Sequence, residues 1–125
     1  MSKKADFKYK NDHNLEERKN ESSRILREYQ NRLPIICELA PQSQLPPLKK
    51  TKYLVPSDMT INQFLFIIRR SIDLNQGLAL YLFTSDKKTV TGNKTIMDLY
   101  GNHKDKEDNF LYLYCDCELI YGQNK

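Results

Sequence analysis

The sequence predicts an α+β domain in which a four-stranded mixed sheet is crossed by one long helix and carries two additional N-terminal helices. Three observations support this prediction. Residues 60–72 have apolar side chains at helical spacing behind a capping pattern. Four other segments are short apolar runs bounded by proline, glycine or polar residues, which is typical of strands. The chain has 125 residues, 39% of them apolar, which is enough for a single core and therefore one domain.

The N-terminal part of the chain is polar and predicts helices that lie on the surface. Residues 1–13 predict a short helix or an arm. From Asn14, an Asn-x-x-Glu capping pattern that includes Glu17 begins a helix extending to residue 29. Its apolar residues are few, namely Leu15, Ile25, Leu26 and Tyr29. We therefore expect residues 1–30 to be a helical extension packed on the domain.

Two strands are predicted to follow this extension. Residues 32–39 form an apolar run with Pro34 near its start, where a strand tolerates proline. After a proline-marked loop, residues 51–56 form a second strand that stops at a proline. Successive side chains of a strand point to opposite faces, so Lys52 and Leu54 face one way while Tyr53 and Val55 face the other. Both faces of the second strand therefore carry apolar groups.

The long helix and the last elements complete the predicted order. Thr60 and Gln63 form a capping box at the start of the helix of residues 60–72. Residues 78–84 predict a strand, residues 94–101 a short helix ending at Gly101, and residues 109–120 the final strand. Helix, strand, strand, long helix, strand, short helix, strand is the order of the ubiquitin-like β-grasp fold, here with an N-terminal helical part.

Composition limits the location and the partners of the protein. No run of about 18 apolar residues is present, and the N-terminus lacks the apolar core of a secretory signal, so we expect a soluble, intracellular protein. The three cysteines, Cys37, Cys115 and Cys117, are then expected to be reduced thiols that pack as small hydrophobic residues. Residues 1–52 hold twelve Lys or Arg against seven Asp or Glu, and residues 53–125 hold eight against nine. The basic part suits acidic proteins, anionic membranes or nucleic acid.

Catalytic and metal-binding patterns are missing from the sequence. There is no phosphate-binding glycine loop and no nucleophile elbow, and neither His13 nor His103 has ligand spacing to a cysteine. We therefore expect no enzyme activity, no cofactor and no metal site. Two other classes stay open at this point. One is a basic RNA-binding module that uses some of the eight tyrosines. The other is a β-grasp domain that acts only by binding partners and is never itself attached covalently to another molecule.

Three separated segments resemble one known family. They are "REYQNRLPIICE" at residues 27–38, "KYLVPSDMTINQFLFIIRR" at residues 52–70 and "DLYGNHKDKEDNFLYLYCDCELIYG" at residues 98–122. From about Phe7 to Gly122 the chain is similar to the ubiquitin-like modifiers of autophagy, the group that includes GABARAP and the microtubule-associated light-chain proteins.

The resemblance implies a modifier that is processed and then conjugated to lipid. Members of the family are cut after a glycine by a cysteine protease, activated with ATP, and passed by conjugating enzymes to phosphatidylethanolamine. Gly122 matches that glycine, and glycine suits the chemistry because it has no Cβ to block a narrow active site. The implied β-grasp domain is then residues 31–122, and residues 123–125 are a removable tail. The implied location is the cytoplasm and, after lipidation, the autophagosome membrane.

The resemblance also implies docking of cargo receptors through short peptides with an aromatic residue, two spacers and an aliphatic residue. Such peptides add a strand to an exposed sheet edge. The matching residues of the aromatic pocket are Glu21, Ile25, Pro34, Ile36, Lys52, Leu54 and Phe110. Those of the aliphatic pocket are Tyr53, Val55, Pro56, Met59, Phe64, Ile67 and Ile68. The matching basic rim is Arg32, Lys49, Lys50 and Arg69, of which Arg69 matches a position associated with precursor processing. No nucleic-acid partner is expected.

Three positions and one loop depart from the family pattern. Gln30 replaces a proline, Ser71 stands where arginine is common, and Asn109 precedes Phe110 where glycine or an aromatic residue is usual. The loop at residues 84–95 lacks a proline pair and is one residue longer. Without an arginine at position 71, we expect one contact to acidic ligand residues to be weaker.

Overall fold

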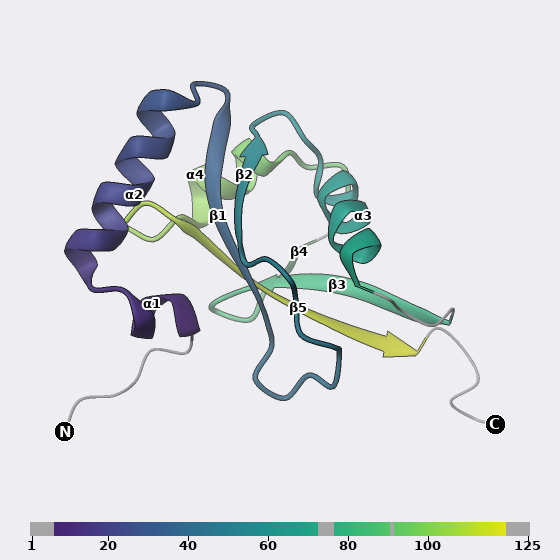
Figure 1. The fold of residues 1–125 in the computed structure, drawn as a ribbon. Helices are drawn as coiled ribbons and strands as arrows, with labels where there is room; N and C mark the ends of the chain where they lie inside the picture. The colour runs from purple at the N-terminus through teal and green to yellow at the C-terminus, as the bar shows by residue number, and fades with distance from the viewer. Residues whose placement is uncertain (1–6, 73–76, 91, 120–125) are drawn as a thin grey trace.

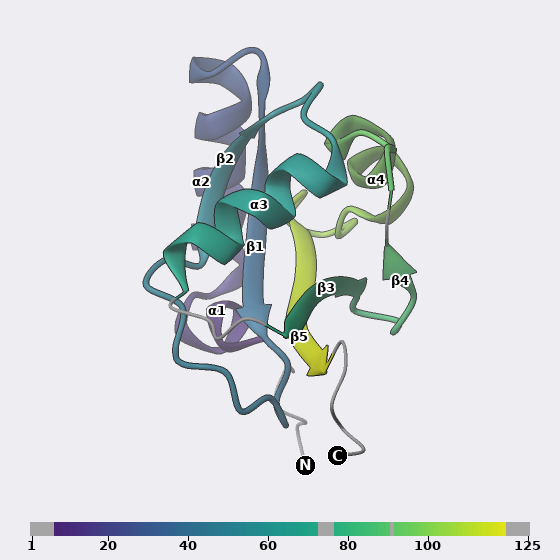
Figure 2. The same ribbon diagram turned by 90° about the vertical axis from the view of Figure 1, so that its right-hand side faces the viewer.

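The computed structural model describes residues 7–72, 77–90 and 92–119, and shows one mixed sheet with helices on both faces (Figures 1 and 2). The five strands lie in the order β2-β1-β5-β3-β4. Their bounds are β1 Arg32–Leu39, β2 Lys52–Pro56, β3 Leu78–Thr84, β4 Thr89–Val90 and β5 Leu111–Leu119. β1 and β5 are parallel, and the other neighbours are antiparallel. The α+β class and the ubiquitin-like arrangement predicted from the sequence are confirmed.

The helices divide between the two faces of the sheet. The helices α1 (Lys8–Asp12) and α2 (Leu15–Glu28) cover one face, called here the α2 face, and α3 (Ile61–Ser71) crosses the other, the α3 face (Figures 1 and 2). Helix α4 (Ile96–His103) precedes the last strand. Both predicted capping boxes are present, one between Asn14 and Glu17 and the other between Thr60 and Gln63. Each box satisfies two backbone N–H groups that the first turn of a helix leaves unpaired.

Alternating side chains of the strands build a core layer on each face. On the α3 face, Leu111, Leu113 and Cys115 pack in one cluster with α3. On the α2 face, Tyr112 and Tyr114 pack with residues of the N-terminal helices and their flanks in a second cluster. Strand β5 lies at the centre of the sheet, so its alternating side chains contribute to the core layers on both faces. The alternation of residues in the sequence predicted this.

Three boundaries differ from the sequence prediction. The sheet has five strands rather than four, because Thr89–Val90 pairs with β3 as a strand of two residues inside the predicted loop. Helix α4 continues past Gly101 to His103. A glycine that ends a helix has a positive φ, and Gly101 does not. Strand β5 starts at Leu111, because Asn109 turns the chain with a φ of 65°.

A buried polar network attaches α2 to the sheet. Asp108 is fully buried and accepts hydrogen bonds from Arg18 Nε at 2.8 Å and from Tyr112 Oη at 2.6 Å. Ser22 Oγ donates to the main-chain oxygen of Asp108 at 2.5 Å. Of the apolar residues predicted for this helix, only Ile25 is buried, so much of its attachment is polar. The network orients the helix whose next turns carry residues of the predicted aromatic pocket.

The remaining expectations concern thiols, metals and membranes. All three cysteines are free thiols, with Cys37 and Cys115 buried and Cys117 half-buried. Within residues 7–72, 77–90 and 92–119, no group of three or more His, Cys, Asp or Glu side chains is arranged to hold a metal ion. None of the helices that the structure describes combines the length and the apolar character needed to cross a bilayer.

Candidate functional site

Strand β2 forms one edge of the sheet, with β1 as its neighbour. Two hydrogen bonds beyond the ends of the strand fix the pairing: Cys37 N donates to Thr51 O at 2.8 Å, and Ser57 N donates to Asn31 O at 2.9 Å. Bonded pairs alternate with non-bonded pairs in an antiparallel ladder. The residues between these two points that bond to β1 are therefore those at odd positions.

The residues at even positions of β2 present their backbone groups to the open edge. Lys52 and Leu54 direct both N–H and C=O away from β1, and Leu54 lies opposite Pro34, which has no N–H to offer. An unpaired row of backbone groups is a template for a further strand. The structure thus presents such a template along β2.

The seven residues predicted for the aromatic pocket meet on the α2 face. Their buried members are Ile25, Pro34, Ile36 and Phe110, and Leu54 packs against the same cluster half-buried. Above them, Lys52 Nζ pairs with Glu21 Oε2 at 2.5 Å. A cavity of about 450 Å³ opens beside this ion pair. Glu21 and Lys52 line this cavity together with Tyr9, His13, Glu17 and Thr51, and the apolar members of the predicted set pack in the neighbouring core layer of the α2 face.

The ion pair beside this cavity involves three side chains, because Glu21 contacts both Lys52 and Arg24. The carboxylate of Glu21 accepts hydrogen bonds from Arg24 and from Lys52, and these bonds lower its pKa to about 2. Glu21 is therefore ionised at neutral pH and holds Lys52 across the mouth of the cavity.

Helix α1 and its C-terminal cap supply pocket residues that the sequence prediction missed. Tyr9 and His13 line the aromatic cavity, and the ring of Tyr9 meets that of Phe110 edge-on at 5.1 Å between centroids. The position of α1 depends on Glu38, whose carboxylate accepts from the main-chain N–H groups of Lys8 and Tyr9 at 2.8 Å each. This contact spans about 30 positions of sequence, so no local pattern pointed to it.

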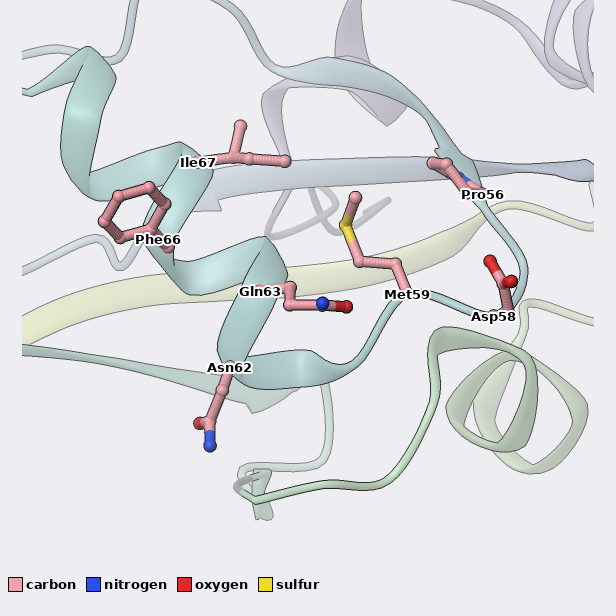
Figure 3. A pocket seen from close by; sticks show the side chains of 7 residues that line it. All are labelled: Pro56, Asp58, Met59, Asn62, Gln63, Phe66 and Ile67. Atoms are coloured by element: carbon pink, nitrogen blue, oxygen red, sulfur yellow. The ribbon is translucent and has the colours of Figure 1, made fainter.

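The residues predicted for the aliphatic pocket lie at the far end of β2. Pro56, Met59 and Ile67 line an open cavity of about 620 Å³ between this end and α3 (Figure 3). The side chains of Met59 and Ile67 point toward the space between the helix and the strand (Figure 3). The other four predicted residues are buried beneath, in the core layer of the α3 face, and are Tyr53, Val55, Phe64 and Ile68.

Four further residues line the same cavity and were missed: Asp58, Asn62, Gln63 and Phe66. Phe66 is 60% exposed, on the side of α3 that faces away from the core. A large apolar residue outside the helical core stripe was the available signal for it.

The predicted basic rim falls in two places. Arg32, Lys49 and Lys50 are exposed at or near β2, and Lys50 Nζ lies 5.0 Å from the centroid of the Tyr53 ring. Arg69 instead lies on the β3 side, where its Nη1 donates to Leu78 O at 2.9 Å.

The hydrogen bond of Arg69 is made to the residue of β3 that pairs with the end of the C-terminal strand. Leu78 pairs with Leu119 at the end of β5. Gly122 and the tail of residues 123–125 lie outside the described residues.

Comparison with known proteins gives a consistent result. The family model described as "Autophagy protein Atg8 ubiquitin like" matches residues 17–122. Autophagy-related protein 8 of Mycosarcoma maydis is 41% identical over 115 residues, which is 92% of this chain and 96% of the relative. Autophagy-related protein 8 of Vanderwaltozyma polyspora is 43% identical over 115 residues, covering 91% of this chain and 95% of the relative.

A solved structure agrees with these relatives. The crystal structure of Trypanosoma brucei ATG8 superposes with a TM-score of 0.85 at 34% identity, over 94% of this chain and 100% of that one. The chain belongs to the Atg8 family of ubiquitin-like autophagy proteins.

Proposed function

We propose that this chain is a cytoplasmic modifier that is cut after Gly122, joined through that glycine to phosphatidylethanolamine on autophagosomal membranes, and there recruits cargo receptors and machinery carrying aromatic-x-x-aliphatic motifs. The observation that carries the docking role is the open β2 edge, which has one cavity on the α2 face beside Lys52 and another on the α3 face beside Pro56. Membership of the Atg8 family supports the conjugation role.

The placement of the two pockets matches the spacing of the motif. The aromatic pocket lies at the Lys52 end of β2 on the α2 face, and the aliphatic pocket lies at the Pro56 end on the α3 face. A peptide that reaches the aromatic pocket first therefore runs parallel to β2. Residues paired in a parallel ladder share a face, so an aromatic residue beside Lys52 places the aliphatic residue, three positions later, beside Val55 on the other face.

Conjugation uses the chain as a substrate, and the reactive thiols belong to its partners. These are a processing cysteine protease, an activating enzyme and conjugating enzymes, which transfer the Gly122 carboxyl group to the lipid amine. In this account residues 31–122 are the conjugated β-grasp domain, residues 1–30 are its helical extension, and residues 123–125 are removed. One such lipid carries two acyl chains, which is enough for stable anchoring.

Two assays test the two parts of the proposal. Fluorescence polarisation with a labelled Trp-x-x-Leu peptide tests docking, and saturable binding that is lost when either anchor is changed to alanine is expected. Reconstituted lipidation on vesicles containing phosphatidylethanolamine tests conjugation, with Gly122→Ala as the variant. Peptide binding without any lipid adduct would instead identify an unconjugated adaptor, and absence of both activities would contradict the proposal.

A further inference from the structure

The C-terminal strand ends beside the last turn of α3. Leu119 pairs with Leu78, and Arg69 Nη1 donates to the oxygen of Leu78 at 2.9 Å. The end of β5, the start of β3 and the end of α3 lie on the same side of the molecule (Figure 1). Gly122 follows three positions after Leu119, and a chain spans at most about 3.5 Å per residue, so this glycine lies within about 10 Å of the end of β5. A lipid joined to Gly122 therefore holds this side of the molecule close to the bilayer.

The two faces of the sheet carry opposite charges on this side. Strand β5 ends with Asp116 and Glu118, whose side chains share the α2 face with that of Tyr114. The last turn of α3, over the other face, carries Arg69 and Arg70 instead. An anionic bilayer repels carboxylates and attracts guanidinium groups, which form charge-assisted hydrogen bonds with lipid phosphates. The charges therefore favour an orientation in which the α3 side meets the membrane.

An exposed aromatic ring lies next to these arginines. Phe66 is 60% exposed, and the guanidinium carbon of Arg70 lies 5.8 Å from the centroid of its ring. Apolar side chains continue from this ring into an open cavity of about 380 Å³ between α3 and β3, which is lined by Asn62, Leu65, Phe66, Arg69, Leu78, Ala79 and Leu80. Exposed phenylalanine and leucine beside arginine are the residues by which a protein surface enters the layer between headgroups and acyl chains.

We propose that the lipid-anchored chain lies against anionic membranes through this surface, called here the α3 membrane surface and made of Phe66, Arg69, Arg70 and Leu78. The ring of Phe66 enters the interfacial layer, and Arg70 binds lipid phosphates. Strand β2 lies on the opposite side of β5 from β3, so the aromatic end of the docking edge stays clear of the bilayer. This inference rests on the proposed conjugation of Gly122 and adds the orientation of the attached domain.

The competing surface on this side of the molecule is on the α2 face of β3. Tyr81 lies there, and its ring stacks on that of Phe83 at 5.8 Å between centroids. Tyr81 pairs with Asp116, and the next residue of this face in β3 pairs with Glu118. Contact of this surface with an anionic bilayer would bring both carboxylates toward the lipid phosphates, which is unfavourable.

Tryptophan fluorescence measures the contact, because the chain contains no tryptophan of its own. Phe66→Trp introduces a single reporter at an exposed site, and Met97→Trp is the matched control, since Met97 is 56% exposed on α4. Both variants are conjugated by the reconstituted enzymes to vesicles of phosphatidylethanolamine, phosphatidylcholine and phosphatidylserine with brominated acyl chains, which quench tryptophan. On conjugation, we expect the emission of the Phe66→Trp reporter to shift to shorter wavelength and to be quenched, and that of the control to stay unchanged.

A second substitution tests the charge. Arg70→Gln, added to Phe66→Trp, should lower the equilibrium constant between the membrane-bound and free orientations of the conjugated protein about 5-fold. Arg27→Gln, which removes the same charge from an exposed part of α2, should leave it unchanged. Vesicles without phosphatidylserine should reduce the quenching of the Phe66→Trp reporter, as Arg70→Gln does.

The outcomes separate the inference from the conjugation on which it rests. If the lipid adduct forms but the Phe66→Trp reporter is quenched no more than the Met97→Trp control, the inference is overturned. Quenching of a Tyr81→Trp reporter in place of the one at Phe66 overturns it too, and assigns the contact to the α2 face. Equal effects of Arg70→Gln and Arg27→Gln exclude the role of Arg70. If no adduct forms on these vesicles, conjugation at Gly122 itself fails.

Discussion

Replacing Asp108 with alanine removes the centre of the network that holds α2 on the sheet. The carboxylate is fully buried and accepts from Arg18 Nε, Tyr112 Oη and the main-chain N of Phe110, at 2.8, 2.6 and 2.9 Å. Burial and the bond to Asp108 also raise the pKa of the Tyr112 hydroxyl well above its usual range, so it stays a donor. After the change, all three donors lose their acceptor in a site closed to water.

The expected cost follows from the charge that is left behind. Removing one partner of a buried ion pair costs about 3–5 kcal/mol, mainly because the other charge stays buried. The Arg18 side chain is 10% exposed and keeps a bond to the oxygen of His13 at 2.7 Å. We therefore place Asp108→Ala at the lower end, about 3 kcal/mol of the unfolding free energy. A domain of this size has about 5–15 kcal/mol in total, so the variant stays folded.

Urea unfolding followed by circular dichroism measures this cost. The double variant with Arg18→Met should lose less than the sum of the two single variants, by about 2 kcal/mol, because the buried charge goes with its partner. Asp98→Ala, at an exposed site in the first turn of α4, is the control and should change stability by about 0.5 kcal/mol or less. A loss below about 1 kcal/mol for Asp108→Ala, or strictly additive losses, would refute this reasoning.

Three further predictions follow from the docking edge and the C-terminal strand. Ile67→Asp should abolish binding of the peptide and leave the urea midpoint almost unchanged, because this residue is 42% exposed. The control variant Leu15→Asp should leave binding intact. Equal binding by both variants would contradict the aliphatic pocket. Folding lowers the pKa of Glu21 from 4.5 to about 2, so the ionised carboxylate stabilises the folded state fully above pH 4.5. This contribution to the unfolding free energy is lost as the pH falls from 4.5 to about 2. Urea titrations at several pH values should therefore show a smaller acid-induced loss for Glu21→Gln than for the wild type, and parallel curves would count against the ion pair. Arg69→Ala removes the bond to Leu78 O next to the end of β5, so protease cleavage of the tail should slow while peptide affinity stays within about twofold; unchanged cleavage would exclude this positioning role.

The regular elements were predictable because their signals are local. Thr60 and Gln63 lie three positions apart, and the apolar stripe behind them is continuous, so α3 follows from neighbours in sequence. The two apolar faces of β2 follow in the same way from alternation. Strand β4 could not be predicted in this way, because a strand of two residues is too short to show an alternating pattern.

The site was only partly predictable because its missing parts depend on distant contacts. Arg18 and Asp108 are 90 positions apart, and nothing near either residue identifies the other. The contact of Arg32 with the Leu54 carbonyl joins a side chain to a backbone atom, which no residue pattern encodes. The family resemblance supplied the pocket residues, and the structure added the polar groups that connect them.

The most direct test of the whole account is the mass of the protein recovered from cells in which the cognate protease and conjugating enzymes are active. The account predicts a chain that ends at Gly122, part of it carrying phosphatidylethanolamine on that residue. Recovery of only the intact form of 125 residues would contradict it.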